Sequence, residues 1–439
     1  MFNLPRGSNM LLRLGVSNYR SIRDYAELSL IASDAIKDKG TDLLELPGAK
    51  YRVLPAIVIY GANAAGKSSI HMALGSMGSH VLNSFRKLEA GAPIPRYPFA
   101  LDKTSKDKPT HFDCDFVIDG VRYHYGYEFN DKEFEREWLY SFPEGYRRVL
   151  FNRDYENDEI EFGKHLKGKN RAIEELMRPN SLFVSVAAQS SHDELTKVYD
   201  FFRHSAQGIG ASLNDDSVQK AIGSKNDQRL VPFLKTADTG ISGLEIREKA
   251  QPEEAKKILA ALRNTLASEM GDEVGSLLLD DNASRTAVFF KHIGEDGELY
   301  ELPFSGESRG TKRLSKVMLS AYEALDRGGV LFVDEIDASL HSLLSIKLVS
   351  LFTNKLTNPR GAQIVTTTHD TNLLCCGSLR RDQIWFAEKA NDGGTQLYPL
   401  TDIKTRNTDN LEKGYLQGRF GAIPYFGDVT ALFGATDNG

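Results

Sequence analysis

An eight-residue run with two glycines, a lysine and a serine carries the pattern most directly tied to chemistry. Gly61 to Ser68 reads GANAAGKS and matches G-x-x-x-x-G-K-[ST]. In this pattern the backbone N–H groups converge on phosphates, Lys67 neutralises the β and γ oxygens, and Ser68 ligates Mg²⁺. The alternative is a glycine-rich turn with a surface lysine. We therefore expect ATP and Mg²⁺ to bind here, with contacts from Gly61, Asn63, Ala64, Ala65, Gly66, Lys67, Ser68 and Ser69.

Two carboxylates follow a short apolar run much further along the chain. The run VLFV at 330–333 is followed directly by Asp334 and Glu335. Phosphoryl transfer needs positioning and charge neutralisation, so Asp334 is predicted to hold Mg²⁺ and Glu335 to polarise the attacking water. The alternative is a strand that ends in a solvated acidic turn.

The remaining candidate site residues are a histidine and a run with basic residues at the predicted start of a helix. His369 follows the β-branched run 363–368, where a neutral imidazole could bond the γ-phosphate or the attacking water. The run SRGTK begins at Ser308 and precedes a helical pattern, which makes an anion-binding helix end. One chain uses one such end per phosphate tail, so Ser308 and Gly310 are expected to reach the ATP of a second copy. A structural histidine and an ordinary basic helix start are the alternatives.

The elements that position these residues follow from hydrophobic periodicity. The apolar run 56–60 predicts a strand, and Ile70, Leu74 and Met77 recur at helical spacing after the glycine loop. Alternating apolar residues on both sides of Asp119-Gly120 predict a hairpin in a small antiparallel sheet inserted after this helix. An amphipathic helix opened by Pro252 predicts a helical insertion. The fold class is therefore α/β, with a mixed central sheet, an antiparallel β subdomain and an α-helical insertion.

These patterns suggest five segments. Residues 1–9 are read as a leader or a cloning remnant, and residues 10–190 as a first ATPase lobe with the glycine loop and the antiparallel subdomain. Residues 191–285 form the helical insertion, residues 286–400 a second lobe, and residues 401–439 a C-terminal tail.

Composition narrows the class of protein. The chain has 439 residues, a net charge of −6 and three cysteines, two of them adjacent. These cysteines supply neither a disulfide framework nor a four-ligand zinc site, and no apolar run is long enough to span a membrane. A cytoplasmic protein without a membrane partner is expected, and DNA binding is unsupported by net charge.

The order of the motifs resembles the ATPase heads of the SMC and RecF-like branch of the ABC superfamily. The resemblance rests on NYRSI at Asn18, the glycine loop, SRGTK, DEIDASLH at Asp334, and TTTHD ending at Asp370. It implies a P-loop fold of the ABC ATPase-head type that hydrolyses ATP in a sandwiched dimer. It further implies that Asn18 and Arg20 lie near the nucleotide, that Asp337 belongs to the D-loop, and that Gln189 senses Mg²⁺. An ordinary helix or loop role is the alternative for Gln189.

Within that branch the chain is similar to stand-alone ATPases of bacterial anti-phage defence systems, including PARIS-like systems and the ATPase half of overcoming-lysogenisation-defect nucleases. The supporting runs are ADTGI from Ala237 and YLQGRFGAIP from Tyr415. The resemblance implies a sensor or regulator that controls a separate effector, a nuclease or toxin, and that responds to a phage-encoded trigger. It leaves open whether assemblies larger than the dimer form. The alternative function is a DNA-repair ATPase that binds DNA directly, through basic runs such as 147–148, 164–171 and 309–313.

Overall fold

The computed structural model describes residues 9–46, 48–154, 159–205, 207–210, 214–248, 261, 286–375, 377–406 and 409–423. The chain forms two compact units, one made of residues 1–211 and 320–439 and the other of residues 212–319. In the described part of the chain, no helix is both long and apolar enough to cross a membrane. The predicted leader 1–9 and the predicted helix from Pro252 lie almost wholly outside the described residues.

A six-stranded sheet forms the centre of the first unit. Its strand order is β11-β15-β16-β5-β17-β18, and every neighbouring pair is parallel except β17 with β18. The strands are β5 (Ala56–Tyr60), β11 (Gln207–Ile209), β15 (Val330–Val333), β16 (Gln363–Thr367), β17 (Ile384–Lys389) and β18 (Thr395–Pro399). All residues of β5, β15 and β16 are buried, as expected for parallel strands covered on both faces. The predicted α/β class with a mixed central sheet is confirmed.

The second sheet is antiparallel and larger than the sequence predicts. Its order is β10-β9-β8-β7-β6-β1-β2, with strands β1 (Met10–Ser17), β2 (Ala26–Ser29), β6 (Thr110–Ile118), β7 (Val121–Phe129), β8 (Phe134–Phe142), β9 (Arg148–Asp154) and β10 (Glu159–Phe162). The predicted hairpin is present, with Asp119 and Gly120 at φ angles of 51° and 82° between β6 and β7. The expectation of a small inserted sheet is corrected, because β1 pairs with β6 along its length and brings the N-terminal strands into the same sheet.

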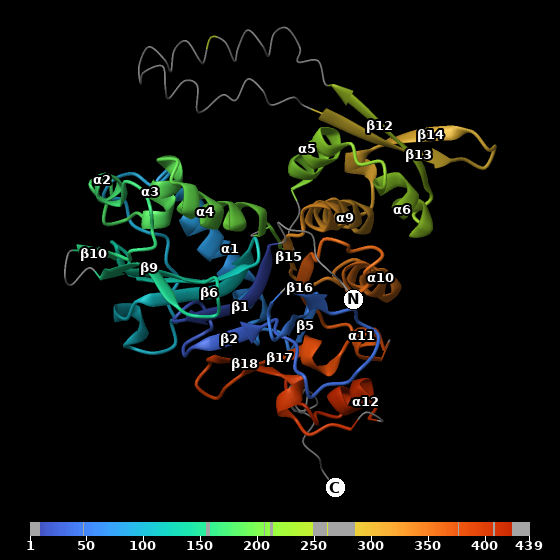
Figure 1. Ribbon diagram of the computed structural model, residues 1–439. Coiled ribbons are helices and arrows are strands. Elements are labelled where there is room, and N and C mark those ends of the chain that lie inside the picture. The colour runs from blue at the N-terminus through green and yellow to red at the C-terminus, as the bar shows by residue number, and fades with distance from the viewer. Residues whose placement is uncertain are drawn as a thin grey trace, which may run out of the picture. The chain divides into compact units, whose positions relative to one another are not determined.

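Helix α1 (Lys67–Asn83) joins the two sheets through their shared core (Figure 1). Its residues Ile70, Leu74 and Met77 belong to one buried cluster with Ile57 of the parallel sheet and Phe112 of the antiparallel sheet. The other helices of this unit are α2 (Asn170–Glu174), α3 (Phe183–Gln189), α4 (Asp193–Ser205), α10 (Ser342–Thr353), α11 (Asn372–Cys375) and α12 (Leu411–Leu416), with a two-stranded sheet of β3 (Leu44–Glu45) and β4 (Arg52–Val53).

The second unit combines helices with a three-stranded antiparallel sheet. It contains α5 (Asp215–Lys225), α6 (Leu230–Thr236), β12 (Ile241–Glu248), β13 (Thr286–Ile293) and β14 (Leu299–Pro303), and α9 (Arg309–Arg327) starts within it. Its limits differ from the predicted helical insertion at 191–285. Helix α4 belongs to the first unit, because Leu195, Val198 and Phe202 lie in the core of that unit. The unit continues past residue 285 because β13 and β14 pair with β12 in sequence order.

Candidate functional site

The glycine loop lies between the end of β5 and the start of α1, as the pattern predicts. A β-carbon on Gly61 would collide with the carbonyl oxygen of Ala387 in β17. Gly66 has a φ of 100°, and a β-carbon there would collide with the hydroxyl of Thr395. Both glycines are therefore required by close approach of neighbouring strands, and Gly66 also by its left-handed backbone.

Three hydroxyl groups, from Ser21, Ser69 and Thr395, form a hydrogen-bonded cluster that contacts this loop. Ser21 Oγ lies 2.8 Å from Ser69 Oγ and 2.8 Å from Thr395 Oγ1, and Thr395 donates to the Ala65 carbonyl at 2.9 Å. Ser21 follows β1 and Thr395 begins β18, so segments far apart in sequence fix the loop. Sequence reasoning missed Ser21 and Thr395, since neither belongs to a pattern with chemistry of its own.

Lys67 begins α1, and its side chain reaches back to the start of the glycine loop. Its ammonium donates to the carbonyls of Gly61 at 2.8 Å and Ala62 at 3.0 Å, and the residue is only 6% exposed. Burial lowers the pKa of Lys67 below its usual value, while the negative charges of Glu335 and Asp334 act in the opposite direction. The lysine and the acidic pair predicted from distant motifs therefore lie within electrostatic range of each other.

One threonine hydroxyl positions both members of the acidic pair. Asp334 is 5% exposed, and its Oδ1 accepts a hydrogen bond of 2.7 Å from Thr367 Oγ1. The same hydroxyl accepts from the Glu335 N–H at 2.7 Å, and Glu335 adopts a φ of 52°. Because of this left-handed backbone, the chain turns sharply just after the carboxyl end of β15. Thr367 was not predicted, although it lies in the TTTH run that precedes His369.

Asp337 and His369 form a second contact between the same strand ends. Thr368 Oγ1 donates to Asp337 Oδ1 at 2.7 Å, and the His369 N–H lies 3.4 Å from both oxygens of that carboxylate. Burial, and next the positive charge of Lys67, lower the pKa of His369 below its ordinary value. The imidazole is therefore neutral at neutral pH, which is the form that a hydrogen bond to phosphate or water was expected to use.

The segment from Asn18 to Ser21 is held by a neighbouring loop. The Asn18 side-chain amide donates to the carbonyls of Ser105 and Lys108 at 2.7 and 2.8 Å, and its oxygen accepts from the Phe99 N–H at 3.0 Å. Arg20 is exposed, and its guanidinium lies over the Tyr97 ring at 4.8 Å. Nucleotide contacts by Asn18 and Arg20 remain predictions. The Asn18 side-chain amide already forms hydrogen bonds with the neighbouring loop.

Gln189 lies far from the predicted metal position. Its side-chain nitrogen is 3.4 Å from the Tyr199 hydroxyl, which donates at 3.1 Å to the carbonyl of Leu82 near the C-terminal end of α1. Ser68 lies in the first turn of α1, about 21 Å away along the helix at its usual rise per residue. The Mg²⁺ contact predicted for Gln189 is therefore corrected.

Ser308 and Gly310 belong to the second unit, at the start of α9. Ser308 is exposed, and its hydroxyl accepts from the Thr311 N–H at 3.0 Å, so it caps this helix. Lys312 pairs with Asp215 at 2.6 Å. Their approach to the ATP of another copy remains a prediction.

The residues fit a magnesium ion held with a nucleotide. Mg²⁺ usually takes one or two protein ligands and completes its shell with phosphate oxygens and water. Asp334 supplies a buried carboxylate already held by a hydroxyl donor, and Ser68 supplies a hydroxyl at the start of α1. Among the described residues no group of three or more His, Cys, Asp or Glu side chains could hold a metal by itself. A metal at this site would therefore rely on the nucleotide for part of its coordination.

Comparison with known proteins gives one family match. A family model described as "AAA domain, putative AbiEii toxin, Type IV TA system" matches residues 56–375. No curated protein matches the chain. Among solved structures, an SMC head bound to the C-winged helix domain of ScpA is 13% identical, with a TM-score of 0.39 and coverage of 89% of this chain and 97% of that chain. An SMC head domain from Thermotoga maritima is 12% identical, with a TM-score of 0.36 and coverage of 90% and 99%.

Proposed function

The chain belongs to the AAA-domain family whose model matches residues 56–375, and on this premise we propose that it binds ATP with Mg²⁺ and hydrolyses it. The observation that carries the proposal is the proximity of Lys67 to Asp334 and Glu335, which opposes the effect of burial on the lysine pKa. A lysine on a glycine loop and two carboxylates at the end of another strand of the same parallel sheet, β15, are the groups that phosphoryl transfer uses for positioning and charge neutralisation.

Each residue has a distinct role in this proposal. The Lys67 ammonium leaves the carbonyls of Gly61 and Ala62 for the phosphate oxygens, and Asp334 orients the metal from its hydroxyl-held position. Bound Mg²⁺ supplies positive charge that offsets the negative charge developing on the transferred phosphoryl group. Glu335 orients the attacking water, and neutral His369 donates or accepts a hydrogen bond at the same strand edge.

Two substitutions separate binding from hydrolysis. We expect Glu335→Gln to lower kcat by about 10² to 10⁴-fold, the range for loss of a general base, while ATP affinity stays near that of the wild type. Lys67→Ala should remove ATP binding as well. Phosphate release and binding of a fluorescent ATP analogue measure the two properties, with the exposed Glu298→Gln and Lys347→Ala as matched controls. Normal turnover by Glu335→Gln would contradict the proposal.

We further propose that two copies close around ATP, with Ser308 and Gly310 of one copy completing the site of the other. The exposed start of α9 is a helix end of the kind that binds anions, which supports this role. Light scattering of Glu335→Gln with ATP should show at least a doubled mass. Ser308→Arg should keep ATP binding at Lys67 and remain monomeric, whereas a dimer in that variant would argue against the arrangement.

We propose that this ATP-driven dimerisation acts as a switch. The switch would regulate a separate effector, a nuclease or toxin, in bacterial anti-phage defence. The family description, which names a toxin of a toxin–antitoxin system, supports this reading. Phage plating on cells that carry the chain with its neighbouring genes tests it. Glu335→Gln and Lys67→Ala should abolish protection, and an unchanged plating efficiency would reject the role.

The contacts of the basic runs give less support to direct DNA binding than the site gives to ATP hydrolysis. Arg148 pairs with Glu144 at 3.2 Å, Arg171 with Glu174 at 2.9 Å and Lys312 with Asp215 at 2.6 Å. Paired cations contribute less to phosphate binding than free ones. A steep loss of duplex DNA affinity with increasing salt would restore the alternative of a DNA-repair ATPase.

A further inference from the structure

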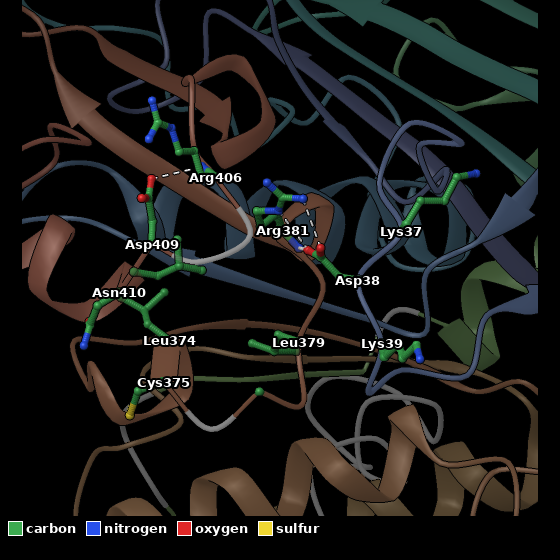
Figure 2. Close-up of a pocket in the computed structure, with 12 residues that line it drawn as sticks. Lys37, Asp38, Lys39, Leu374, Cys375, Leu379, Arg381, Arg406, Asp409 and Asn410 are labelled. Carbon is green, nitrogen blue, oxygen red and sulfur yellow. Dashed lines mark hydrogen bonds and ion pairs between the residues drawn. The ribbon is translucent and has the colours of Figure 1, made fainter.

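A cavity of about 510 Å³ lies in the first unit, and none of the residues assigned to ATP lines it (Figure 2). Segments distant in sequence build it: the loop around Asp38, helix α11, and the stretch that leads into α12. These segments are tied together. Thr41 donates to the Ser378 carbonyl at 2.7 Å, and Gly40 packs so closely on the Gly377 carbonyl that a β-carbon would collide with it. The volume is within the ~300–1,000 Å³ of small-molecule sites.

The charges around the cavity are mostly positive. Arg381 is engaged by Asp38, which accepts from its Nε and its second terminal nitrogen at 3.0 Å each. Figure 2 shows Lys37 and Lys39 on one side of this pair and Arg406 on the other. The side chains of these three exposed cations have no ionic partner among the described residues. The two carboxylates of the lining are each paired with an arginine, Asp38 with Arg381 and Asp409 with Arg419. An anion at the rim would therefore meet cations whose charge is not already compensated.

Part of the remaining wall is apolar, and Asp409 and Asn410 complete it with polar side chains. Leu374 and Leu379 are buried and Leu411 is half-buried, and all three line the cavity. An apolar wall with cations at the rim favours a ligand that joins a negatively charged group to a hydrophobic body, since each part then has a matching surface. We propose that this cavity binds a small organic anion of that kind, which carries a phosphate or a carboxylate.

The cavity also adjoins the strand edge assigned to ATP. Leu374 and Cys375 belong to α11, which begins three residues after His369. Asp370 holds this connection, because its Oδ1 accepts from the Asn372 N–H at 3.0 Å and its carbonyl accepts from the Tyr60 hydroxyl at 3.2 Å. Tyr60 is the residue before the glycine loop. Occupancy of the cavity would thus alter the position of His369 and the rate of hydrolysis, a step that rests on the proposed ATPase function.

Binding of anilinonaphthalene sulfonate, a dye with a sulfonate and an apolar body, tests the site on the full chain with ADP and Mg²⁺ added to fill the glycine loop. Replacing both rim cations in Lys39→Ala/Arg406→Ala should weaken dye affinity about tenfold, because each exposed charge contributes modestly. Lys404→Ala removes an exposed cation of the same segment that does not line the cavity, and should leave the affinity unchanged. Equal dye affinity in the wild type and the double variant would overturn the proposal.

Competition identifies the charged group. Displacement of the dye by pyrophosphate indicates a phosphate ligand and displacement by octanoate a carboxylate, whereas failure of both to displace it would overturn the assignment. In the wild type the displacing anion should also change the ATPase rate, and this effect should vanish in the double variant. An unchanged rate would reject the link through α11. Dye binding needs no hydrolysis, so a chain without ATPase activity would reject the proposed function and leave the cavity result intact.

Discussion

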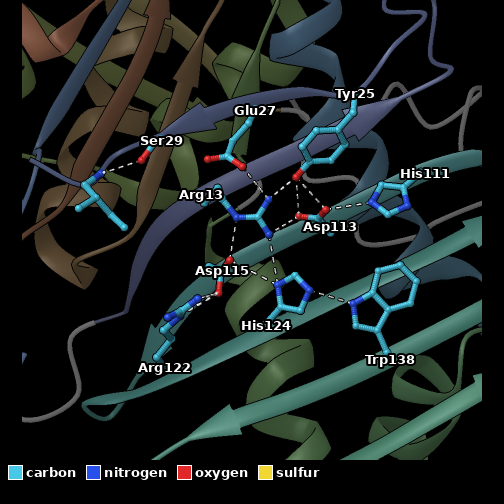
Figure 3. Close-up of polar contacts among 11 residues, drawn as sticks. Arg13, Tyr25, Glu27, Ser29, His111, Asp113, Asp115, Arg122, His124 and Trp138 are labelled. Atoms are coloured by element: carbon cyan, nitrogen blue, oxygen red, sulfur yellow. Dashed lines mark hydrogen bonds and ion pairs between the residues drawn. The ribbon is translucent and has the colours of Figure 1, made fainter. Parts of the chain in front are cut away.

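The two sheets of the first unit both carry polar side chains, but they place and pair them differently. In the parallel sheet, Asp334 and Asp337 lie just beyond the carboxyl end of β15 and accept from the hydroxyls of Thr367 and Thr368. In the antiparallel sheet, Asp113 and Asp115 lie within β6, where Arg13 of β1 binds both carboxylates (Figure 3). A hydroxyl fixes a carboxylate without cancelling its charge, whereas an arginine cancels it.

The position along each strand explains this difference. Side chains alternate between the faces of a strand, so Asp113 and Asp115 point away from the core that Phe112, Cys114 and Phe116 fill. There the cluster extends through His124, which lies 3.3 Å from Asp115 and accepts from Trp138 at 3.0 Å. We conclude that mid-strand charges serve stability here and strand-end charges are available to a ligand. Three substitutions test this difference between the two sheets.

The largest effect on folding is expected from Asp113→Asn. Arg13 is only 16% exposed, and removing one of its three carboxylate partners leaves a partly buried charge undercompensated. We expect a loss of about 3 kcal/mol in the apparent free energy of unfolding, measured in urea, with kcat unchanged. The exposed pair of Arg23 with Asp24 is the control, and Asp24→Asn should cost less than about 0.5 kcal/mol. A fall in kcat without loss of stability would reverse the assignment.

A smaller effect, on hydrolysis instead of folding, is expected from Thr367→Val. The substitution keeps the shape of the side chain but removes the hydroxyl that bonds both Asp334 and the Glu335 N–H. Loss of a group that orients a metal ligand typically costs about 10- to 100-fold, and we expect a drop in kcat of that size. Thr367→Ser should restore most of the rate. If the serine variant is as slow as the valine variant, packing and not the hydroxyl explains the loss.

The smallest effect is the pH dependence of the antiparallel cluster. Burial by itself would lower the pKa of His111, but its bonds to Asp113 and Glu128 outweigh burial and raise the pKa to about 9. A raised pKa in the folded state stabilises the fold fully below the unfolded pKa near 6.5, and this contribution is lost as the pH rises through about 9. Between pH 6 and 9.5 the stability advantage of the wild type over His111→Gln should therefore shrink by about 1 to 2 kcal/mol. Parallel curves for the two proteins would show that folding does not raise the pKa of His111.

Local patterns predicted the parts of the site that depend on neighbours in sequence. The glycine loop, the acidic pair after β15 and the Asp119-Gly120 hairpin each follow from a short run of neighbouring residues. Ser21, Thr367 and Thr395 could not be found this way, because their roles arise only when strands distant in sequence lie side by side. A single serine or threonine, whether it lies in a loop as Ser21 does or in a strand as Thr367 and Thr395 do, has no distinguishing pattern of its own.

Two errors have definite physical causes. The family resemblance placed Gln189 near the metal, but the contacts of Gln189 lie near Leu82, at the opposite end of α1 from Ser68. The limits of the insertion were set where polar composition changes. Strand pairing, and not composition, defines the second unit, so β13 and β14 extend it beyond residue 285.

The place of β5 in the parallel sheet has a consequence for synthesis on the ribosome. β5 leads directly into the glycine loop, yet both of its neighbours, β16 and β17, come from the last third of the chain. A growing chain that already contains the complete GANAAGKS run has no sheet in which to place it. At roughly 5–20 residues per second, about 330 further residues take on the order of 15 to 65 seconds to emerge. If the chain binds ATP as proposed, the nascent protein should be unable to do so until both neighbouring strands of β5 have been synthesised.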